Sequence, residues 1–258
     1  AEAVAIEKIT EAVGKSTNPA NYLLAQKYIQ MMQQLAEGDK TKTVFLPYEA
    51  NSGFINFDRV RPFKKDILEK AFHAFRTQSA DDADYRTFCE KEAYWLKDYA
   101  LFHAAKKEHG GAAWMEWPEE IKHRAPDALN ALAERQRDAV ELDYFKQYVF
   151  HTQWNRLHAY ARTKGIEILG DMPIFIAQDS ADVGAHQQLF DLNEDGSPHT
   201  VAGVPPDYFA VNGQLWGNPQ YNWTAMAEEH YAWWKRRFRK LREQVDIIRI
   251  DHFRGFES

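Results

Sequence analysis

The feature that most constrains this chain is the run IIRID at residues 247 to 251, near its end. Apolar residues without helical spacing, followed by a glycine at position 255, predict a short buried strand that runs into a loop. Because side chains alternate along a strand, Arg249 and Asp251 are expected on the same face. A guanidinium so near favours an ionised carboxylate, the form that a nucleophile requires. The alternative is a strand-end ion pair that has no catalytic role.

An earlier segment has the same layout. A helical pattern ends at Lys164 and Gly165, the strand pattern of residues 166 to 169 follows at once, and the strand ends in Gly170 and Asp171. A long excursion and another helical pattern then lead to residue 247. This order is typical of a parallel α/β unit, in which the loops that form a pocket leave from the carboxyl ends of the strands. We therefore expect Asp171 and Asp251 at one pocket mouth.

The excursion contains a second group of candidate residues. Glycines, prolines and large aromatic residues alternate over residues 202 to 219, which predicts a loop with preset turns and exposed rings. Such rings stack on sugars, whose hydroxyls need polar partners. The aromatic candidates are Tyr208, Phe209 and Trp216, and the polar ones are Asp207, Gln214 and Asn218. The alternative is an Ω-loop packed by its own aromatic residues.

Charge, cysteine content and hydropathy bear on compartment and partners. A formal net charge of -6, without a basic cluster, argues against nucleic acid as a partner. The single cysteine, Cys89, excludes an internal disulfide and suits a reducing compartment. No apolar run approaches the roughly 20 residues that cross a bilayer, and the first residues do not resemble a signal peptide. We expect a soluble cytoplasmic protein that makes no membrane contact.

The sequence also predicts that no metal or other cofactor is bound. Residues 191 to 196 match the start of an EF-hand calcium loop, but Ala202 stands where that loop requires a bidentate glutamate. The histidines have no paired spacing with cysteines or carboxylates that would indicate a metal site. The segment 191 to 196 is therefore interpreted as a tight turn.

Composition divides the chain into three parts. Residues 1–52 predict two helices and a short strand, 53–142 a helical subdomain, and 143–258 the α/β part with the candidate loop. In the helical subdomain Pro62 is expected to open a helix, with Phe63, Ile67, Ala71 and Phe75 on one side.

Three segments carry a family resemblance: GDMPIFIAQDSADV at 170 to 183, VAGVPPDYFAVNGQLWGNPQYNW at 201 to 223, and IIRIDHFRGFES at 247 to 258. Together they resemble the amylomaltases, the 4-α-glucanotransferases of glycoside hydrolase family 77. The resemblance implies a (β/α)8 TIM barrel with helical insertions, of which two strands are present here, so that the fold class is α/β with a partial barrel. It also implies a retaining double displacement that moves α-1,4-glucan segments.

The resemblance further implies a role for each matching residue. Asp251 would be the nucleophile, Arg249 the arginine beside it, and Asp171 a contact to the donor sugar. Tyr208 and Phe209 would lie on a mobile loop over the cleft, and Trp216 would stack on sugar near the scissile bond. The substrate-binding set is completed by Asp207, Asn218 and His252.

Activity in this family also depends on a second carboxyl group. Retaining transfer needs a general acid, which in the family comes from a later strand, so we expect this chain alone not to catalyse transfer. If it does, Asp171 or Asp207 is the first candidate for the acid. Open strand edges lead us to expect self-association or a complementing barrel segment.

Residues 1–52 resemble a different family, the C-terminal segment of slipin (stomatin-like) proteins, through their helix, break, helix and short strand. That resemblance implies self-association. Two further functions therefore stand beside the enzyme: an oligomerising scaffold that carries an inactive glucanotransferase fragment, and a glucan-binding module without turnover.

Overall fold

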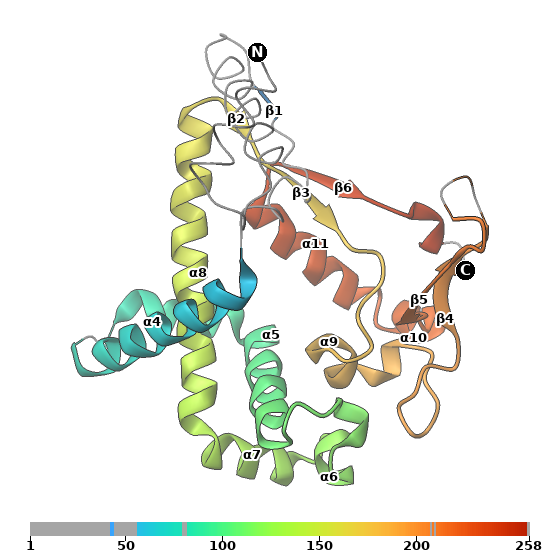
Figure 1. Ribbon diagram of the computed structural model, residues 1–258, viewed down its shortest axis with the longest axis horizontal. Helices are drawn as coiled ribbons and strands as arrows, with labels where there is room; N and C mark the ends of the chain where they lie inside the picture. Colours follow the sequence, from blue (N-terminus) through green and yellow to red (C-terminus); the bar gives the residue numbers. More distant parts are fainter. Residues whose placement is uncertain (1–41, 44–55, 79–81, 207, 209, 257–258) are drawn as a thin grey trace, which may run out of the picture.

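The computed structural model describes residues 42–43, 56–78, 82–206, 208 and 210–256 (Figure 1). The helices are α4 (Phe57–Gln78), α5 (Ala83–Glu108), α6 (Glu119–Lys122), α7 (Pro126–Arg135), α8 (Arg137–Thr163), α9 (Ala181–Ala185), α10 (Trp223–Glu228) and α11 (Ala232–Gln244). The strands are β1 (Lys42–Thr43), β2 (Ile166–Glu167), β3 (Leu169–Met172), β4 (Val201–Val204), β5 (Gln214–Pro219) and β6 (Ile247–Ile250). Short 3-10 turns are η1 (Trp114–Glu116), η2 (Gln187–Leu189) and η3 (Phe253–Phe256). The helices and strand predicted before residue 36 and at 44–48 lie outside the described residues.

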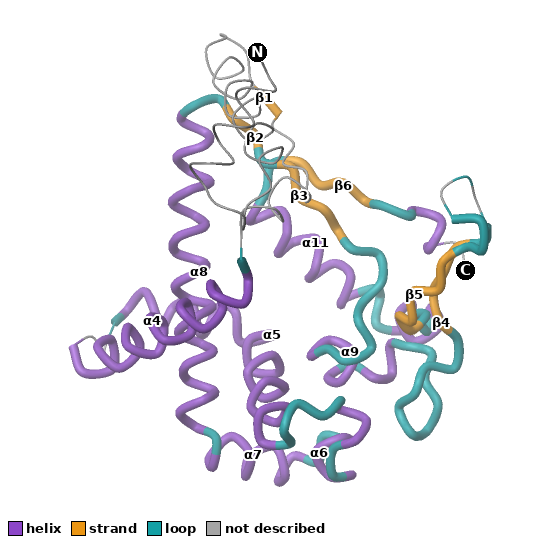
Figure 2. Tube along the Cα trace, viewed as in Figure 1, coloured by secondary structure: helices purple, strands orange, loops and turns teal. Residues whose placement is uncertain are grey.

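Strands β3 and β6 confirm the predicted parallel pair. Asp171 lies opposite Arg249 in the register, and α11 packs along both strands (Figure 2). The prediction that β6 is buried is wrong, because its residues alternate between exposed and half-buried and Ile247 is 36% exposed. Among the described residues β6 pairs with β3 alone, so its second edge has no strand to cover it.

A single residue separates β2, which pairs with β1 in parallel, from β3. This residue, Ile168, donates its N–H to the carboxylate of Asp246 at 2.9 Å and accepts the backbone N–H of the same residue at 2.9 Å. The start of β6 is thereby joined to the break between β2 and β3.

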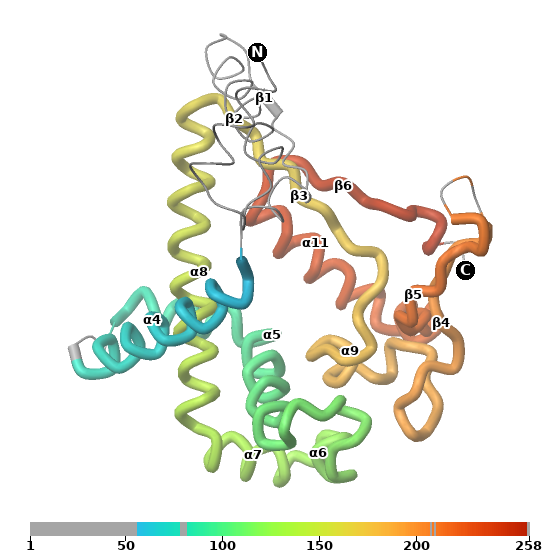
Figure 3. The backbone as a smooth tube through the Cα atoms, viewed as in Figure 1, coloured from blue at the N-terminus to red at the C-terminus, as the bar shows by residue number. Residues whose placement is uncertain are grey.

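The segment between β3 and β6 differs from the predicted loop. It runs through α9 and α10, and its central part is an antiparallel hairpin of β4 and β5 (Figure 3). Gly203 allows the two strands to approach, since a Cβ there would lie 2.4 Å from the carbonyl oxygen of Gln214. Gly213, at φ +71°, turns the chain into β5. The sequence predicted turns in this segment, but it did not predict that β4 and β5 pair.

The helical part is built on α5 and α8, which pack along each other, with α4 crossing α8 (Figure 1). The expected start of α4 at Pro62 is wrong: the helix begins at Phe57, and Asn56 Oδ1 accepts the N–H of Arg59. On the predicted apolar side, Phe63 is 63% exposed. Only the C-terminal half of α4, with Phe72, is buried against α8, because the first half extends beyond it.

One apolar core joins the helical part to the α/β part. Its members come from α5, η1, α6 and α7 and from β3, α10 and α11, including Trp114, Met172 and Trp233. Helix α8 also runs without a break through residues 142 and 143. Within the described residues, no helix is both long enough and apolar enough to span a membrane.

The expectation of no basic cluster is wrong for α11, in which six of the eight residues from 235 to 242 are Lys or Arg. Two of these cations are partly buried and contact other residues. Arg237 lies over the rings of Trp233 and Trp234, and Lys240 pairs with Glu92 of α5 at 2.7 Å.

Candidate active site

Arg249 connects the two predicted carboxylates. Its Nη2 lies 2.8 Å from Asp171 Oδ2 and its Nε lies 3.2 Å from Asp171 Oδ1, which makes a bidentate pair across the β3–β6 register. The same Nη2 lies 3.4 Å from Asp251 Oδ2. The hydrogen bond and charge of Asp171, followed by the charge of Asp251, raise the pKa of Arg249. The predicted convergence at the carboxyl ends of two parallel strands is therefore present, although Asp171 is the closer partner.

The backbone turns sharply at His252 and orients the carboxylate of Asp251. His252 has φ +48°, a left-handed conformation that is uncommon for a residue with a side chain. In this turn its N–H donates to Asp251 Oδ1 at 3.0 Å, and its ring Nε2 lies 3.6 Å from Asp251 Oδ2. Asp251 is thus contacted from both sides, by the guanidinium of Arg249 and by the backbone of His252.

Trp216 of β5 forms an aromatic wall at the same place. Its ring centroid lies 4.7 Å from that of His252 and 6.0 Å from that of Phe175. Its indole Nε1 donates to Gln214 Oε1 at 3.0 Å. The hairpin therefore brings a half-buried indole to the residue that follows Asp251, as a sugar-stacking role requires.

The other predicted hairpin residues have different positions. Tyr208 is 95% exposed at the tip of the hairpin, and Asp207 and Phe209 lie outside the described residues. Asn218 Nδ2 donates to the carbonyl oxygen of Ile176 at 2.9 Å, so this amide binds backbone.

Asp246 is a residue that the sequence analysis missed. It accepts hydrogen bonds from His158 Nε2 at 2.8 Å, from Arg162 Nε at 2.8 Å and from the N–H of Ile168. Burial acts to raise its pKa, but these three donors outweigh burial and lower the pKa to about 2. An aspartate immediately before an apolar strand was the only available signal, because its partners are about 80 residues away.

The predicted tight turn at 191–196 is present. Gly196 has φ +86°, and Asp195 Oδ1 accepts the N–H of Ser197 at 2.9 Å. In the part of the chain that the structure describes, no group of three His, Cys, Asp or Glu side chains is arranged to hold a metal ion.

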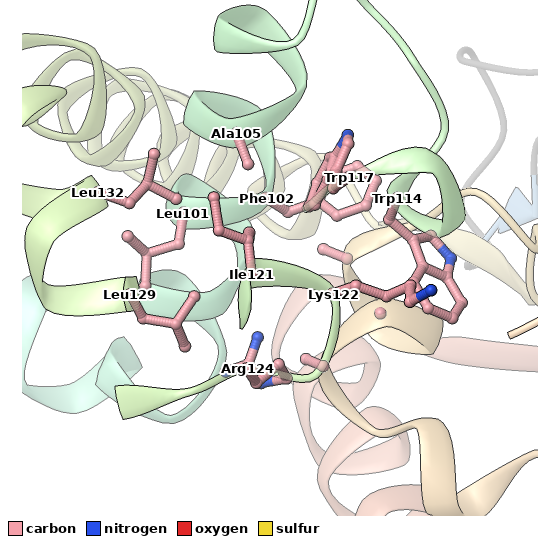
Figure 4. A pocket seen from close by; sticks show the side chains of 13 residues that line it. Leu101, Phe102, Ala105, Trp114, Trp117, Ile121, Lys122, Arg124, Leu129 and Leu132 are labelled. Atoms are coloured by element: carbon pink, nitrogen blue, oxygen red, sulfur yellow. The ribbon is translucent and has the colours of Figure 1, made fainter. Parts of the chain in front are cut away.

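A cavity in the helical part lies among Leu101, Trp114, Trp117, Ile121 and Leu132 (Figure 4). Its volume of about 20 Å³ is enough for roughly one water molecule. A sugar ring does not fit there, and none of the predicted site residues lines it. The candidate site is defined by contacts, those of Arg249 with Asp171 and Asp251 and that of Trp216 with His252.

Comparison with known proteins gives a family match. Residues 15–258 match the family model of glycoside hydrolase family 77, 4-alpha-glucanotransferase. The chain is 44% identical over 207 residues to the 4-alpha-glucanotransferase of Synechocystis, covering 79% of this chain and 41% of the relative. It is 41% identical over 247 residues to that of Aquifex aeolicus, covering 95% of this chain and 50% of the relative. The chain thus spans about half the length, or less, of these relatives.

A solved structure agrees with this match. The amylomaltase of Streptococcus agalactiae in complex with acarbose superposes with a TM-score of 0.74 at 36% identity, covering 78% of this chain and 41% of that one. The family match begins at residue 15, so most of segment 1–52 lies inside it, and the slipin resemblance there stays a prediction. On the extent of the family match and the identity to its members, the chain belongs to the 4-alpha-glucanotransferases of glycoside hydrolase family 77.

Proposed function

We propose that this chain takes part in 4-α-glucanotransferase chemistry, moving α-1,4-glucan segments with Asp251 as the nucleophile. The observation that carries the proposal is the double contact of Arg249 with Asp171 and Asp251 at the ends of paired parallel strands. Family membership supports it, because relatives that share this half of their sequence are 4-alpha-glucanotransferases. The proposed partners are maltooligosaccharides, and acarbose, which the amylomaltase of Streptococcus agalactiae binds, is a proposed ligand.

The proposed reaction has two displacements. An Asp251 oxygen bonds to C1 of the donor sugar, and the C1–O bond breaks with its electron pair leaving on the released glucan, whose oxygen takes a proton from a general acid. A hydroxyl of the acceptor then attacks C1 and gives its proton to the same group, and Asp251 departs as a carboxylate. The donor's C1–O bond is broken, the C1–Asp251 bond is made and then broken, and the acceptor's C1–O bond is made, with no redox change.

Each remaining residue has a proposed place in this reaction. Arg249 orients both carboxylates, and Asp171 binds hydroxyls of the donor sugar. Trp216 and His252 form the wall on which a sugar ring stacks. The proposed contacts from the hairpin tip and β5 are Asp207, Tyr208, Phe209 and Asn218.

The proposed setting of this site is a partial (β/α)8 barrel in which β3 and β6 are two of the strands. The helical segment 53–142 is an insertion, segment 1–52 an oligomerising part, and 143–258 the barrel part. The parallel register of β3 and β6 and the superposition on an amylomaltase support the barrel. The single cysteine supports a cytoplasmic location.

The deciding experiment is disproportionation of maltotriose by the purified chain, alone and with a polypeptide that supplies the remaining barrel segments. Glucose release that requires Asp251, and is lost in Asp251→Asn, is the expected result for the supplemented sample. Release by the chain alone would assign the general acid to its own residues, with Asp171 and Asp207 tested first. Maltoheptaose binding without release in either sample would favour the glucan-binding module instead.

A further inference from the structure

The segment that leaves β3, residues 173–178, is held by side chains from three other parts of the molecule. Arg237 Nη2 of α11 donates to the carbonyl oxygen of Pro173 at 2.9 Å, and the hydroxyl of Tyr221 donates to that of Ile174. Asn218 Nδ2 of β5 donates to the carbonyl oxygen of Ile176 at 2.9 Å. Trp114 Nε1 of η1 donates to the carbonyl oxygen of Gln178 at 2.7 Å. The backbone here belongs to no strand. These donors therefore determine where the segment lies.

Two of the donors are too deep to touch a substrate. Tyr221 is 5% exposed, and burial raises its pKa, so its hydroxyl keeps the proton that it donates. The Arg237 guanidinium is buried over the rings of Trp233 and Trp234, with centroid distances of 4.7 and 4.6 Å. Ile174 is buried, so the loss of the Tyr221 donor leaves its carbonyl unsatisfied, which favours movement of the segment.

The held segment leads through contacting rings to the proposed nucleophile. Tyr221 stacks on Phe175 at 6.1 Å, and Phe175 lies 6.0 Å from Trp216. Trp216 in turn lies 4.7 Å from His252, whose N–H donates to Asp251. Each ring in this series contacts the next, so a shift of Phe175 has to move Trp216 or open a gap beside it.

The turn after Asp251 rests on the same segment. A Cβ added at Gly255 of η3 would lie 2.9 Å from Ile174 Cγ1 and 3.2 Å from Phe175 Cζ, closer than ordinary contacts. The absence of a side chain at Gly255 thus lets η3 pack directly on Ile174 and Phe175. The segment supports the proposed site both through Trp216 and through η3.

We propose that Tyr221 and Arg237 are positioning residues for the glucan site. By binding the carbonyls of Ile174 and Pro173 they hold Phe175 against Trp216, and so set the sugar-stacking wall relative to Asp251. This inference rests on the proposed function, which it deepens by naming what holds the sugar-stacking wall in place. Neither side chain takes part in bond making or breaking.

The test compares Tyr221→Phe, which removes only the hydroxyl, with Tyr160→Phe on the exposed surface of α8 as the matched control. Hydrogen exchange is measured by mass spectrometry over residues 173–178 and 214–218, and maltotriose disproportionation and maltoheptaose affinity are measured on the same samples. For Tyr221→Phe we expect exchange about tenfold faster in both segments. We also expect a kcat/KM about tenfold lower or a Kd about tenfold higher, because small misplacements near a reacting centre are costly.

Each outcome decides one claim. Unchanged exchange at 173–178 would overturn the positioning role whatever the activity. Faster exchange with wild-type kinetics and affinity would show that the segment is held but does not set the site, which also overturns the proposal. If the wild-type chain neither binds nor converts maltooligosaccharides even with the remaining barrel segments, the proposed function fails. The exchange data then still show whether Tyr221 holds residues 173–178 in place. Should Tyr221→Phe fail to fold, Arg237→Met removes the donor to the carbonyl oxygen of Pro173 and gives the same exchange readout.

Discussion

Arg249 shows why an arginine, and not another cation, suits its position. A planar guanidinium can bind Asp171 through two nitrogens and still reach Asp251 through one of them, whereas a lysine offers a single ammonium. All three side chains are about half exposed, so their ion pairs add little to stability. The value of the cluster lies in the orientation of the carboxylates.

In the chain supplemented with the remaining barrel segments, Arg249→Met should therefore lower kcat/KM for maltotriose by about 100-fold, comparable with the loss of one oriented donor in other active sites, and Arg249→Lys should lose less. The free energy of unfolding should change by less than about 1 kcal/mol in both. Steady-state kinetics and urea unfolding measure the two effects. Arg137→Met, which breaks the exposed pair with Glu141, is the control. Equal activity of Arg249→Met and the control would contradict the role of Arg249.

Trp216→Ala removes the aromatic wall beside His252. Stacking of a planar ring contributes about 1 to 3 kcal/mol, so the Kd for maltoheptaose should rise by about 5- to 150-fold. Isothermal titration calorimetry measures the change, and Tyr160→Ala on α8 serves as the control. An unchanged Kd would mean that Trp216 acts only in packing.

At the scale of elements, one polar contact joins a helix to the strands, and another joins two helices. Asp246 joins α8 to the break between β2 and β3, through His158, Arg162 and the backbone of Ile168. Glu92, which is 1% exposed on α5, pairs with Lys240 of α11 at 2.7 Å. Burial acts to raise the pKa of Glu92, but Lys240 and then Trp95 outweigh it and lower the pKa. Both contacts join residues that are far apart in the sequence.

The Asp246 contact predicts a pH dependence of stability. Its pKa of about 2 in the folded protein lies below the ordinary 3.8, so the unfolded chain takes up this proton first as the pH falls. Its contribution to stability is complete above about pH 4 and is lost between about pH 4 and pH 2. Asp246→Asn should lower the free energy of unfolding by about 1 to 3 kcal/mol at neutral pH, and the difference from wild type should shrink across that window.

Urea unfolding at a series of pH values measures this difference. Asp138→Asn is a suitable control, because Asp138 also pairs with an arginine, Arg76, but has an exposed side chain. A constant difference between wild type and Asp246→Asn from pH 5 to below pH 3 would show that the proton linkage lies elsewhere.

The Glu92–Lys240 ion pair predicts that substitutions of its two residues have non-additive effects on the free energy of unfolding. Lys240→Met leaves a buried carboxylate without its cation and should destabilise the fold by about 3 to 5 kcal/mol. The double variant with Glu92→Met removes both charges and should recover most of that loss. Urea unfolding of the single and double variants measures the coupling. Lys70→Met, from the exposed pair with Asp66, should change little; a double variant no more stable than Lys240→Met would contradict the prediction.

At the scale of the whole molecule, the core is continuous but several large apolar side chains face outward. On the first half of α4 these are Phe57, Phe63 and Ile67, and on α8 they are Phe150, Leu157 and Tyr160. Exposed apolar groups of this kind usually mark surfaces that contact other protein. One edge of β6 adds unpaired backbone in the described part of the chain.

We therefore predict that the chain self-associates at micromolar concentration. Size-exclusion chromatography with light scattering should give a mass that rises with concentration, and Phe63→Ser with Ile67→Ser should lower it towards one chain. Phe253→Ser, which also removes an exposed ring but lies in η3, is the control. A single-chain mass at every concentration would contradict both this prediction and the oligomerising role proposed for residues 1–52.

Local patterns were enough to predict the parallel unit and its polar residues. The run around Arg249 and Asp251, and the matching segment before Asp171, are short strands whose side-chain alternation follows from backbone geometry alone. Turn residues likewise predicted the tight turn at 191–196. These features depend on neighbours within a few positions, so the sequence by itself determined them.

Contacts between distant residues could only be decided by the tertiary structure. Whether Arg249 binds Asp171 more closely than Asp251 depends on the register of β3 and β6, and the buried side of α4 depends on where α8 crosses it. The donors that hold residues 173–178 come from positions 114, 218, 221 and 237, and no local pattern marks a side chain that binds a carbonyl so far along the chain. The amino-acid sequence thus determined which residues lie at the strand ends, and long-range packing decided how their side chains are oriented.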